Sequence, residues 1–394
     1  MTSKDIIELA DSYVLPTYSR FPVAFSSGRG AILTDFDGKE YVDFASGIGV
    51  NSLGYANEKW VQAVSAQAGR LAHASNLYYT EPCARLAQVL TTRSGMAQAF
   101  FANSGAESNE GIIKLARKYS FDKYGHGRSN IVTLINSFHG RTVTTLKATG
   151  QERFHNYFFP FTEGFTYAVA GELDSVIEAA GKNSCAVMME LVQGEGGVMP
   201  LSKDFVQGVA KFCRDNDLLL LIDEVQTGVG RTGSLFAFQQ YGIEPDAVSF
   251  AKGIGGGLPL GGFMVNEKCR SVLGPGTHAT TFGGNPICCA GALAVLDEIN
   301  DELLLEVKTR GDYIRQKLTA IESSYISDVR GLGMMIGIEI NGTSHSELVK
   351  KMLSEGLVCL TAGSNVIRLL PPLTISYEEI DRGIKIFRKV LEEA

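Results

Sequence analysis

Lys252 is the residue whose surroundings point most directly to covalent chemistry. It follows the short apolar run at residues 246–251, and glycine occupies four of the next five positions. A surface lysine does not need such a bare loop, whereas a nucleophilic lysine needs open space for a planar partner and a depressed pKa. The sequence therefore predicts a Schiff-base lysine at position 252.

Asp223 supplies a carboxylate at a matching position. It follows the apolar run at residues 218–222 and precedes Lys252 by 29 residues, the length of one strand–helix–strand unit. Neighbouring strand ends then place the carboxylate and the amine around one pocket. Taken alone, Asp223 could equally be a helix cap or a surface acid. A Walker B acid is excluded because the chain has no GxxxxGK[ST] loop.

Two polar segments lie between other predicted elements. Residues 103–107 precede a predicted helix whose first N–H groups suit an anion, although this segment alone favours an ordinary helix cap. Residues 137–141 include His139, which by itself is typical of a hydrogen-bonded structural residue. They also include Arg141, whose guanidinium group matches carboxylates.

Further glycine loops complete the set. Residues 193–197 contain Glu195, and residues 280–286 begin with two threonines. Together these segments supply what a pyridoxal phosphate site requires: an imine lysine, an acid for the ring nitrogen, a stacking ring, a phosphate loop and an arginine. Residues 228–233 also match GxGxxG, but two acids and three further residues separate them from their strand, which disfavours a dinucleotide site.

The elements that must position these residues alternate along the chain. Short apolar, β-branched runs predict strands at residues 130–135, 184–192, 218–225 and 246–251. Helical spacing predicts helices at residues 107–119 and 204–213. This alternation implies an α/β fold with a mostly parallel sheet that binds ligands beyond the carboxyl ends of its strands.

Both ends of the chain are typical of α+β structure. Short strands are predicted at residues 30–36, 39–44 and 366–369, a glycine-broken strand at 330–340, and a helix at 344–355. We expect an N-terminal segment, residues 1–55, that joins a small domain. Residues 56–300 would form the large cofactor-binding domain, and residues 301–394 the rest of the small domain.

Composition excludes several classes of protein. The 394 residues are 45% hydrophobic and 20% charged with a net charge of −7, which excludes a disordered or fibrous chain and argues against nucleic-acid binding. No apolar stretch is long enough for a membrane span, and no signal-peptide core is expected. Seven cysteines without a CxxC pair favour free thiols in a reducing cytoplasm, and no metal site is predicted.

The sequence resembles the class III, ornithine-type aminotransferases, which use pyridoxal phosphate and have fold type I. The likeness runs from about Tyr18 to the C-terminal region, and its most specific pieces are residues 223–226 with 228–233, then 251–253, then 281–286. Within this class, residues 16–24, 75–82 and 138–141 are most similar to the group that acts on N-acetylornithine in arginine biosynthesis.

The resemblance implies a role for each matched residue. Lys252 would carry the cofactor and then move the proton, and Asp223 would keep the ring nitrogen protonated. The implied cofactor-binding residues are Gly105, Ala106, Phe138, Asp223, Glu224, Val225, Gln226, Lys252 and Thr281. Thr281 would reach the site of the neighbouring subunit in a homodimer.

Substrate contacts are implied in the same way. Arg141 would bind the α-carboxylate of the donor, with Thr280 nearby. Arg368 would take a carboxylate of glutamate or 2-oxoglutarate, and Glu195 would pair with Arg368 while the other substrate is bound.

Three positions depart from the family pattern. Ala106 stands where threonine is usual, which keeps the backbone N–H but loses a hydroxyl contact, and Leu191 replaces a common proline. Ile48 stands where ornithine aminotransferases carry tyrosine. An aliphatic residue at this position resembles the acetylornithine and 4-aminobutyrate enzymes instead.

The implied reaction moves the terminal amine of N2-acetylornithine to 2-oxoglutarate, giving N-acetylglutamate 5-semialdehyde and glutamate. The alternatives are the same chemistry on ornithine, succinylornithine, 4-aminobutyrate or another ω-amino acid, and an aminomutase or racemase. A mutase would need no separate acceptor, so Arg368 argues against it. A non-catalytic binding protein would not need the lysine, the acid and the glycine loops together.

Overall fold

A seven-stranded sheet forms the centre of the larger domain in the computed structural model, which describes all 394 residues. Its spatial order is β4 (Gln98–Ala102), β12 (Gly261–Val265), β11 (Ala247–Phe250), β10 (Leu219–Asp223), β7 (Ser184–Glu190), β5 (Asn130–Leu134) and β6 (Phe165–Ala168). Only β12 runs antiparallel to its neighbours. The predicted α/β class with a mostly parallel sheet is therefore confirmed.

The central strands are buried along their whole length. Every residue of β10 and β7 is buried, and both strands are apolar except near their ends. A parallel strand shows no alternation of polar residues when helices cover both faces of its sheet. Register places Asp223 beside Glu190 on one side and Ser249 on the other, so three polar side chains meet at one sheet edge.

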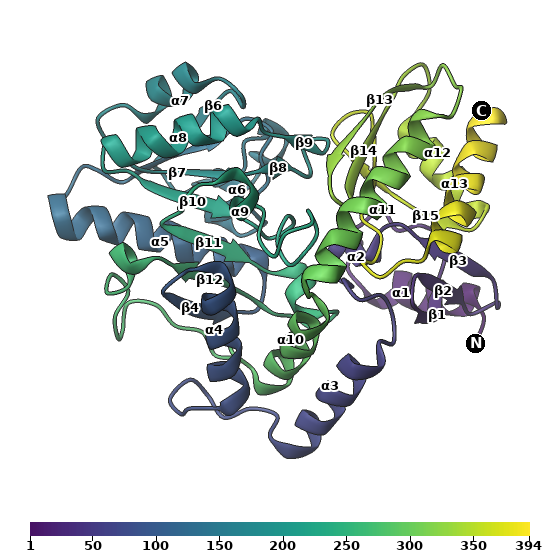
Figure 1. The fold of residues 1–394 in the computed structure, drawn as a ribbon, viewed down its shortest axis with the longest axis horizontal. Helices are drawn as coiled ribbons and strands as arrows, with labels where there is room; N and C mark the ends of the chain where they lie inside the picture. Colours follow the sequence, from purple (N-terminus) through teal and green to yellow (C-terminus); the bar gives the residue numbers. More distant parts are fainter.

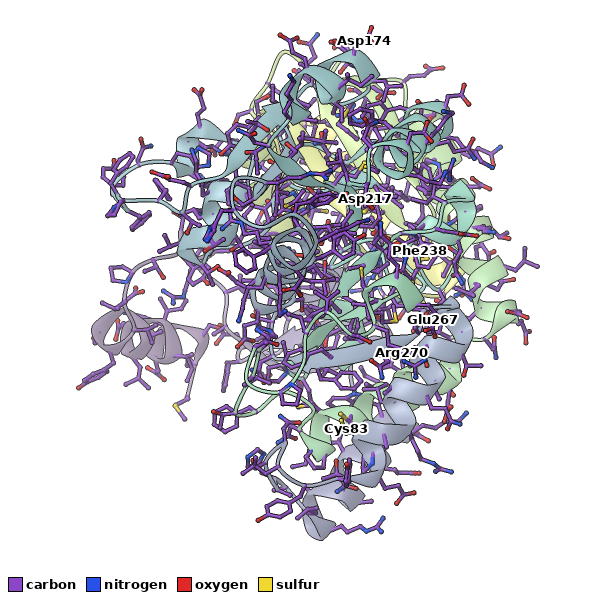
Figure 2. All side chains as sticks on the ribbon, turned by 90° about the vertical axis from the view of Figure 1, so that its left-hand side faces the viewer. Cys83, Asp174, Asp217, Phe238, Glu267 and Arg270 are labelled. Atoms are coloured by element: carbon purple, nitrogen blue, oxygen red, sulfur yellow. The ribbon has the colours of Figure 1, made fainter.

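Helices pack around this sheet. They are α3 (Glu58–Arg70), α4 (Glu81–Ser94), α5 (Gly105–Tyr124), α6 (Val143–Ala148), α7 (Leu173–Ala180), α8 (Lys203–Asp215), α9 (Phe238–Tyr241) and α10 (Pro286–Glu298), with short 3-10 turns η1 (Glu152–Phe154), η2 (Lys252–Gly255) and η3 (Glu267–Cys269). Figure 2 shows the outer side of this domain, with Asp174 of α7 near the top and Cys83 of α4 near the bottom. No helix of the chain is both long enough and apolar enough to cross a membrane.

The smaller domain contains both ends of the chain, which lie on the same side of Figure 1. One of its sheets joins β1 (Phe25–Arg29), β2 (Ile32–Asp35), β3 (Glu40–Asp43) and β15 (Leu357–Val358). The other joins β13 (Ile326–Leu332), β14 (Met335–Ile340), β17 (Val366–Leu369) and β16 (Leu360–Ala362). The helices of this domain are α1 (Ser3–Tyr13), α11 (Asp301–Thr319), α12 (His345–Ser354) and α13 (Tyr377–Glu392). A separate two-stranded sheet pairs β8 (Val192–Gln193) with β9 (Met199–Pro200).

The expected single strand at residues 330–340 is wrong. These residues span the end of β13 and all of β14, which pair antiparallel in a hairpin. Gly331 has φ of +142° and Gly333 has φ of +57°, both in the region that favours glycine. The glycines that were interpreted as a break in one strand instead allow the chain to reverse direction.

A left-handed turn links the two domains. Helix α2 (Ser46–Gly49) has positive φ at all four residues, including +66° at Ile48. Left-handed backbone costs an L-residue about 1–2 kcal/mol, and β-branched Ile48 is a pronounced outlier. The Asp43 carboxylate accepts hydrogen bonds from the N–H groups of Ala45 and Ser46, which holds the turn in place.

Candidate active site

A cavity of about 400 Å³ lies at the carboxyl ends of the central strands. Asp223 and Lys252 both line it, as do residues from the start of α5 and from the loop after β5. The pocket therefore occupies the place at which open α/β sheets bind their ligands. The predicted lysine and acid meet there although 29 residues separate them in the chain.

Asp223 is held by three hydrogen bonds and is only 4% exposed. Its Oδ2 accepts from Asn109 Nδ2 at 2.7 Å and from His139 Nδ1 at 2.8 Å, while Oδ1 accepts from the Val225 N–H at 3.0 Å. A carboxylate has about four acceptor positions. Three donors orient the group and leave capacity for one further donor from the cavity.

Sequence reasoning missed the neighbours of Asp223. The sequence by itself favours a structural role for His139, and Asn109 lies inside a predicted helix. Glu190 lies inside the strand predicted at residues 184–192, whereas β7 ends at Glu190. The carboxylate of Glu190 accepts from the N–H of Phe138 at 2.8 Å and of Gly194 at 3.2 Å, and burial raises its pKa to about 7. The sequence signal that could have identified Glu190 is an acidic residue near the end of an apolar run.

The start of α5 forms a small cradle. Ser104 accepts a hydrogen bond from the Glu107 N–H at 3.2 Å, and Gly105 and Ala106 line the cavity. The first N–H groups of a helix have no carbonyl partner within it and attract anions. A Cβ at position 105 would lie 2.7 Å from Val225 Cγ1, so only glycine fits at this approach.

Lys252 begins η2 with φ of +48°. Its ammonium group makes no hydrogen bond or ion pair within the chain. Burial, followed by the positive charge of Arg368, lowers the pKa of Lys252. A lysine that is neutral at lower pH than usual is the form that attacks a carbonyl carbon.

The pKa of Lys252 can be measured by its reactivity with acetic anhydride in protein freed of cofactor. We expect half-maximal labelling below pH 10.5, the ordinary lysine value. Because the carboxylate of Glu195 raises this pKa and Arg368 lowers it, Glu195→Gln should shift the labelling curve to lower pH and Arg368→Met to higher pH. Peptide mass spectrometry gives the labelled fraction, with an exposed lysine such as Lys4 as the internal control. Shifts in the opposite directions would contradict this electrostatic assignment.

Phe138 lines the cavity, but Arg141 does not. The guanidinium carbon of Arg141 lies 5.5 Å from the centre of the Phe138 ring and 4.1 Å from that of Phe154. Arg141 is exposed and has no carboxylate partner in the chain. It is therefore held beside the pocket with its N–H groups free.

Arg368 occupies a buried position on β17. Its Nη1 lies 2.7 Å from Glu195 Oε1 and donates to Gln226 Oε1 at 3.2 Å. The Arg368 side chain is 3% exposed and that of Glu195 is 28% exposed. Gln226 lines the cavity, so the structure brings this expected pair of substrate residues to its edge.

The two threonines lie away from the cavity of their own chain. Thr280 Oγ1 accepts from Asn103 Nδ2 at 3.3 Å, and the side chain of Thr281 is exposed. Asn103 lines the cavity, so Thr280 is linked to the cavity through Asn103.

Glu224, one of the expected cofactor-binding residues, does not line the cavity. It is fully buried and accepts from the N–H groups of Phe238 at 2.7 Å and Ala237 at 2.9 Å, and from the Thr227 hydroxyl at 2.7 Å. Neighbouring side chains at a strand end point to opposite sides. Asp223 therefore enters the pocket while Glu224 points toward α9, where Figure 2 labels Phe238.

These residues fit the cofactor that the resemblance implies. The cavity has an unpaired lysine, an oriented acid with spare acceptor capacity and a helix N-terminus that suits a phosphate. Each matches one part of pyridoxal phosphate: the aldehyde, the ring nitrogen and the phosphate group. Phe138 supplies a ring at the cavity wall.

Comparisons with known proteins agree with this geometry. The sequence profile of the family described as aminotransferase class-III matches residues 13–391. The acetylornithine aminotransferase of Haemophilus ducreyi is 49% identical over the full length of both chains. The acetylornithine aminotransferase of Caldanaerobacter subterraneus is 44% identical and covers 98% of this chain and 99% of its own. The succinylornithine transaminase of Citrobacter koseri is 42% identical over 97% of this chain and 96% of its own.

Solved structures share the fold over nearly the whole chain. The ornithine aminotransferase of Toxoplasma gondii superposes with a TM-score of 0.96 at 29% identity, covering 100% of this chain and 96% of its own. The N-acetylornithine aminotransferase of Stenotrophomonas maltophilia gives 0.85 at 32% identity over 98% of each chain. With the profile match, the full-length identity and the assembled site, the chain belongs to the class-III aminotransferases, enzymes that use pyridoxal phosphate.

Proposed function

We propose that this aminotransferase moves the terminal amine of N2-acetylornithine to 2-oxoglutarate, giving N-acetylglutamate 5-semialdehyde and glutamate. This is a step of arginine biosynthesis. Relatives named acetylornithine aminotransferase, 49% and 44% identical over essentially the whole chain, support this choice. The structural observation that carries it is the pair of arginines at the site, one unpaired and one neutralised by Glu195.

When bound, pyridoxal phosphate supplies a carbonyl that captures the amine and a ring that accepts electrons from the substrate carbon. Lys252, which has no partner in the chain and a lowered pKa, would remove the proton from that carbon and return it. Asp223 would hold a proton at the ring nitrogen, and its three hydrogen bonds keep the carboxylate oriented. The cradle of Gly105 and Ala106 would bind the phosphate.

Arg141 and Arg368 have different roles in substrate binding: Arg141 for the donor and Arg368 for 2-oxoglutarate. Arg141, with free N–H groups, would bind the donor's α-carboxylate and so place the terminal amine at the cofactor carbonyl. While Glu195 occupies Arg368, that arginine offers no site for a second carboxylate. 2-Oxoglutarate carries a carboxylate at each end, and its binding displaces Glu195 from Arg368.

Succinylornithine is the second candidate donor. The succinylornithine transaminase of Citrobacter koseri is 42% identical to this chain over nearly its whole length. Succinylornithine and N-acetylornithine have the same α-carboxylate and terminal amine and differ only in the acyl group. Both would bind Arg141 in the same way.

A single-turnover experiment tests the donor. The enzyme loaded with cofactor is mixed, without acceptor, with N-acetylornithine, succinylornithine, ornithine or 4-aminobutyrate, and loss of the cofactor's visible absorbance is followed. We expect N-acetylornithine to react with the highest ratio of rate to apparent dissociation constant. A higher ratio for another donor would assign that donor instead, and the absence of any reaction would reject the proposed function.

We also infer a homodimer in which Thr281 reaches the neighbouring site. Thr281 is exposed beside Phe282, which is 61% exposed, and the segment with exposed Leu77 and Tyr78 packs against the same loop through Asn76. Large exposed apolar side chains in a cluster are typical of an interface. Sedimentation velocity should give twice the chain mass of 42.5 kDa.

The cell compartment we propose is the cytoplasm. All seven cysteines are free thiols, and six of them are buried. Such thiols persist in a reducing compartment.

A further inference from the structure

The ring of Phe154 is the nearest aromatic group to Arg141, and no sequence motif pointed to it. It lies 4.1 Å from the guanidinium carbon, against 5.5 Å for Phe138. The two rings are 6.1 Å apart and inclined at 74°. Arg141 thus contacts two aromatic rings, one of which lines the cavity and one of which does not.

Phe154 is fixed relative to the loop that carries Arg141. Its segment is anchored by Gln151, whose Nε2 donates to the Ser137 carbonyl at 3.0 Å, and by the N–H of Gly150, which donates to Ser137 Oγ at 3.0 Å. On the other side of Phe154, His155 Nε2 contacts the Leu146 carbonyl at 3.0 Å. These hydrogen bonds tie the 3-10 turn η1 to the loop that carries Arg141.

Stacking suits an arginine that must bind a carboxylate. A guanidinium group interacts with aromatic rings through its flat face and donates hydrogen bonds from its edge, so both contacts can form together. Arg141 is exposed and unpaired, and without a ring against it the long side chain would lose more rotamer freedom on binding. Arg153 also lies 4.8 Å from the Phe154 ring but is tied to Gln151 Oε1 at 2.7 Å.

We propose that Phe154 is a positioning residue that holds the Arg141 guanidinium ready for the donor's α-carboxylate and so sets affinity for carboxylate-bearing donors. This inference rests on the role of Arg141 in the proposed function. Phe154 touches neither the reacting amine nor the cofactor. Its effect should appear in the binding of the donor and not in the rate of the chemical step.

The experiment measures single turnovers of the cofactor-loaded enzyme with two donors. N-acetylornithine carries the α-carboxylate, whereas 1,4-diaminobutane offers a terminal amine on a similar chain without one. We expect Phe154→Ala to raise the apparent dissociation constant for N-acetylornithine about three- to tenfold while the limiting rate changes by less than about twofold. The reaction with 1,4-diaminobutane should be unchanged, and Phe154→Trp should retain wild-type affinity.

A double-mutant cycle with Arg141→Met isolates the contact. In that background, Phe154→Ala should add no further loss for N-acetylornithine, because the guanidinium is already absent. Phe158→Ala is the matched control, since this exposed ring lies on the same segment, pairs with the ring of Tyr157 and makes no aromatic or cation–π pair with Arg141. It should leave both donors unaffected.

Three results would overturn the proposal. Equal losses for the two donors would mean that Phe154 acts through Phe138 or through folding. Additive losses in the cycle would mean that it acts independently of Arg141. If Arg141→Met itself leaves N-acetylornithine binding intact, Phe154 has no carboxylate site to position. Failure of the proposed function gives a different result from failure of this inference, because the wild-type enzyme would then react better with another carboxylate-bearing donor. The same double-mutant cycle is then run with that donor.

Discussion

Replacing Lys252 by alanine lowers turnover of N-acetylornithine and 2-oxoglutarate by at least about 10⁴-fold, because both the amine that carries the cofactor and the base that moves the proton are lost. No other lysine lines the cavity and could take over. The measurement is single-turnover absorbance at saturating cofactor. Far-ultraviolet circular dichroism and thermal unfolding should remain near those of the wild type, since the Lys252 ammonium makes no structural hydrogen bond.

A small amine provides the control for this loss. Methylamine at high concentration should restore part of the proton transfer in Lys252→Ala, because the missing side chain leaves space for it, and should not accelerate the wild-type enzyme. A Lys252→Ala protein that turns over within tenfold of wild type would remove Lys252 from the mechanism.

The second large effect is expected when Asp223 is replaced. Asp223→Asn keeps the shape of the side chain but loses the negative charge that holds a proton on the ring nitrogen, and we expect proton abstraction to slow by about 10²- to 10³-fold. Cofactor binding should weaken less, because the Gly105 and Ala106 cradle is untouched. A primary deuterium isotope effect on the single-turnover rate shows whether proton abstraction limits the variant.

Asp217 offers a matched control at the other end of the same strand, just outside it. It lies just before β10 starts, whereas Asp223 ends it, and Figure 2 labels it on the outer side of the large domain. Its carboxylate pairs at 2.8 Å with Lys123, near the end of α5 opposite the end that lines the cavity. Asp217→Asn should leave the single-turnover rate unchanged. Equal rates for Asp223→Asn and wild type would contradict the role given to Asp223.

That Asp223 and Lys252 lie at one cavity could be predicted because their placement depends on local rules. A buried parallel strand must end at the edge where ligands bind, so an acid after one apolar run and a lysine after the next were expected to meet. Residues 223 and 252 do line one cavity. The mostly parallel sheet followed from the same alternation of runs and helical segments.

The supporting residues could not be found in this way, since their positions depend on how distant segments pack. Asn109 reaches Asp223 from across 114 positions of the chain, and His139 from across 84. Phe154 contacts Arg141 across a loop whose ends are joined by the hydrogen bond from Gln151 to the Ser137 carbonyl. A motif search also cannot tell which of two adjacent acids faces the cavity, and Glu224 faces away from it.

The pairing of β3 with β15 has a consequence for how the protein is made. Val42 lies opposite Leu357, a partner that leaves the ribosome 315 residues later. At about 5–20 residues per second, the first strands wait on the order of 15–60 s before their sheet can be completed. The large domain is synthesised in that interval and can fold first. Exposed strands near the nascent N-terminus are therefore the part of this chain most in need of protection by chaperones during translation.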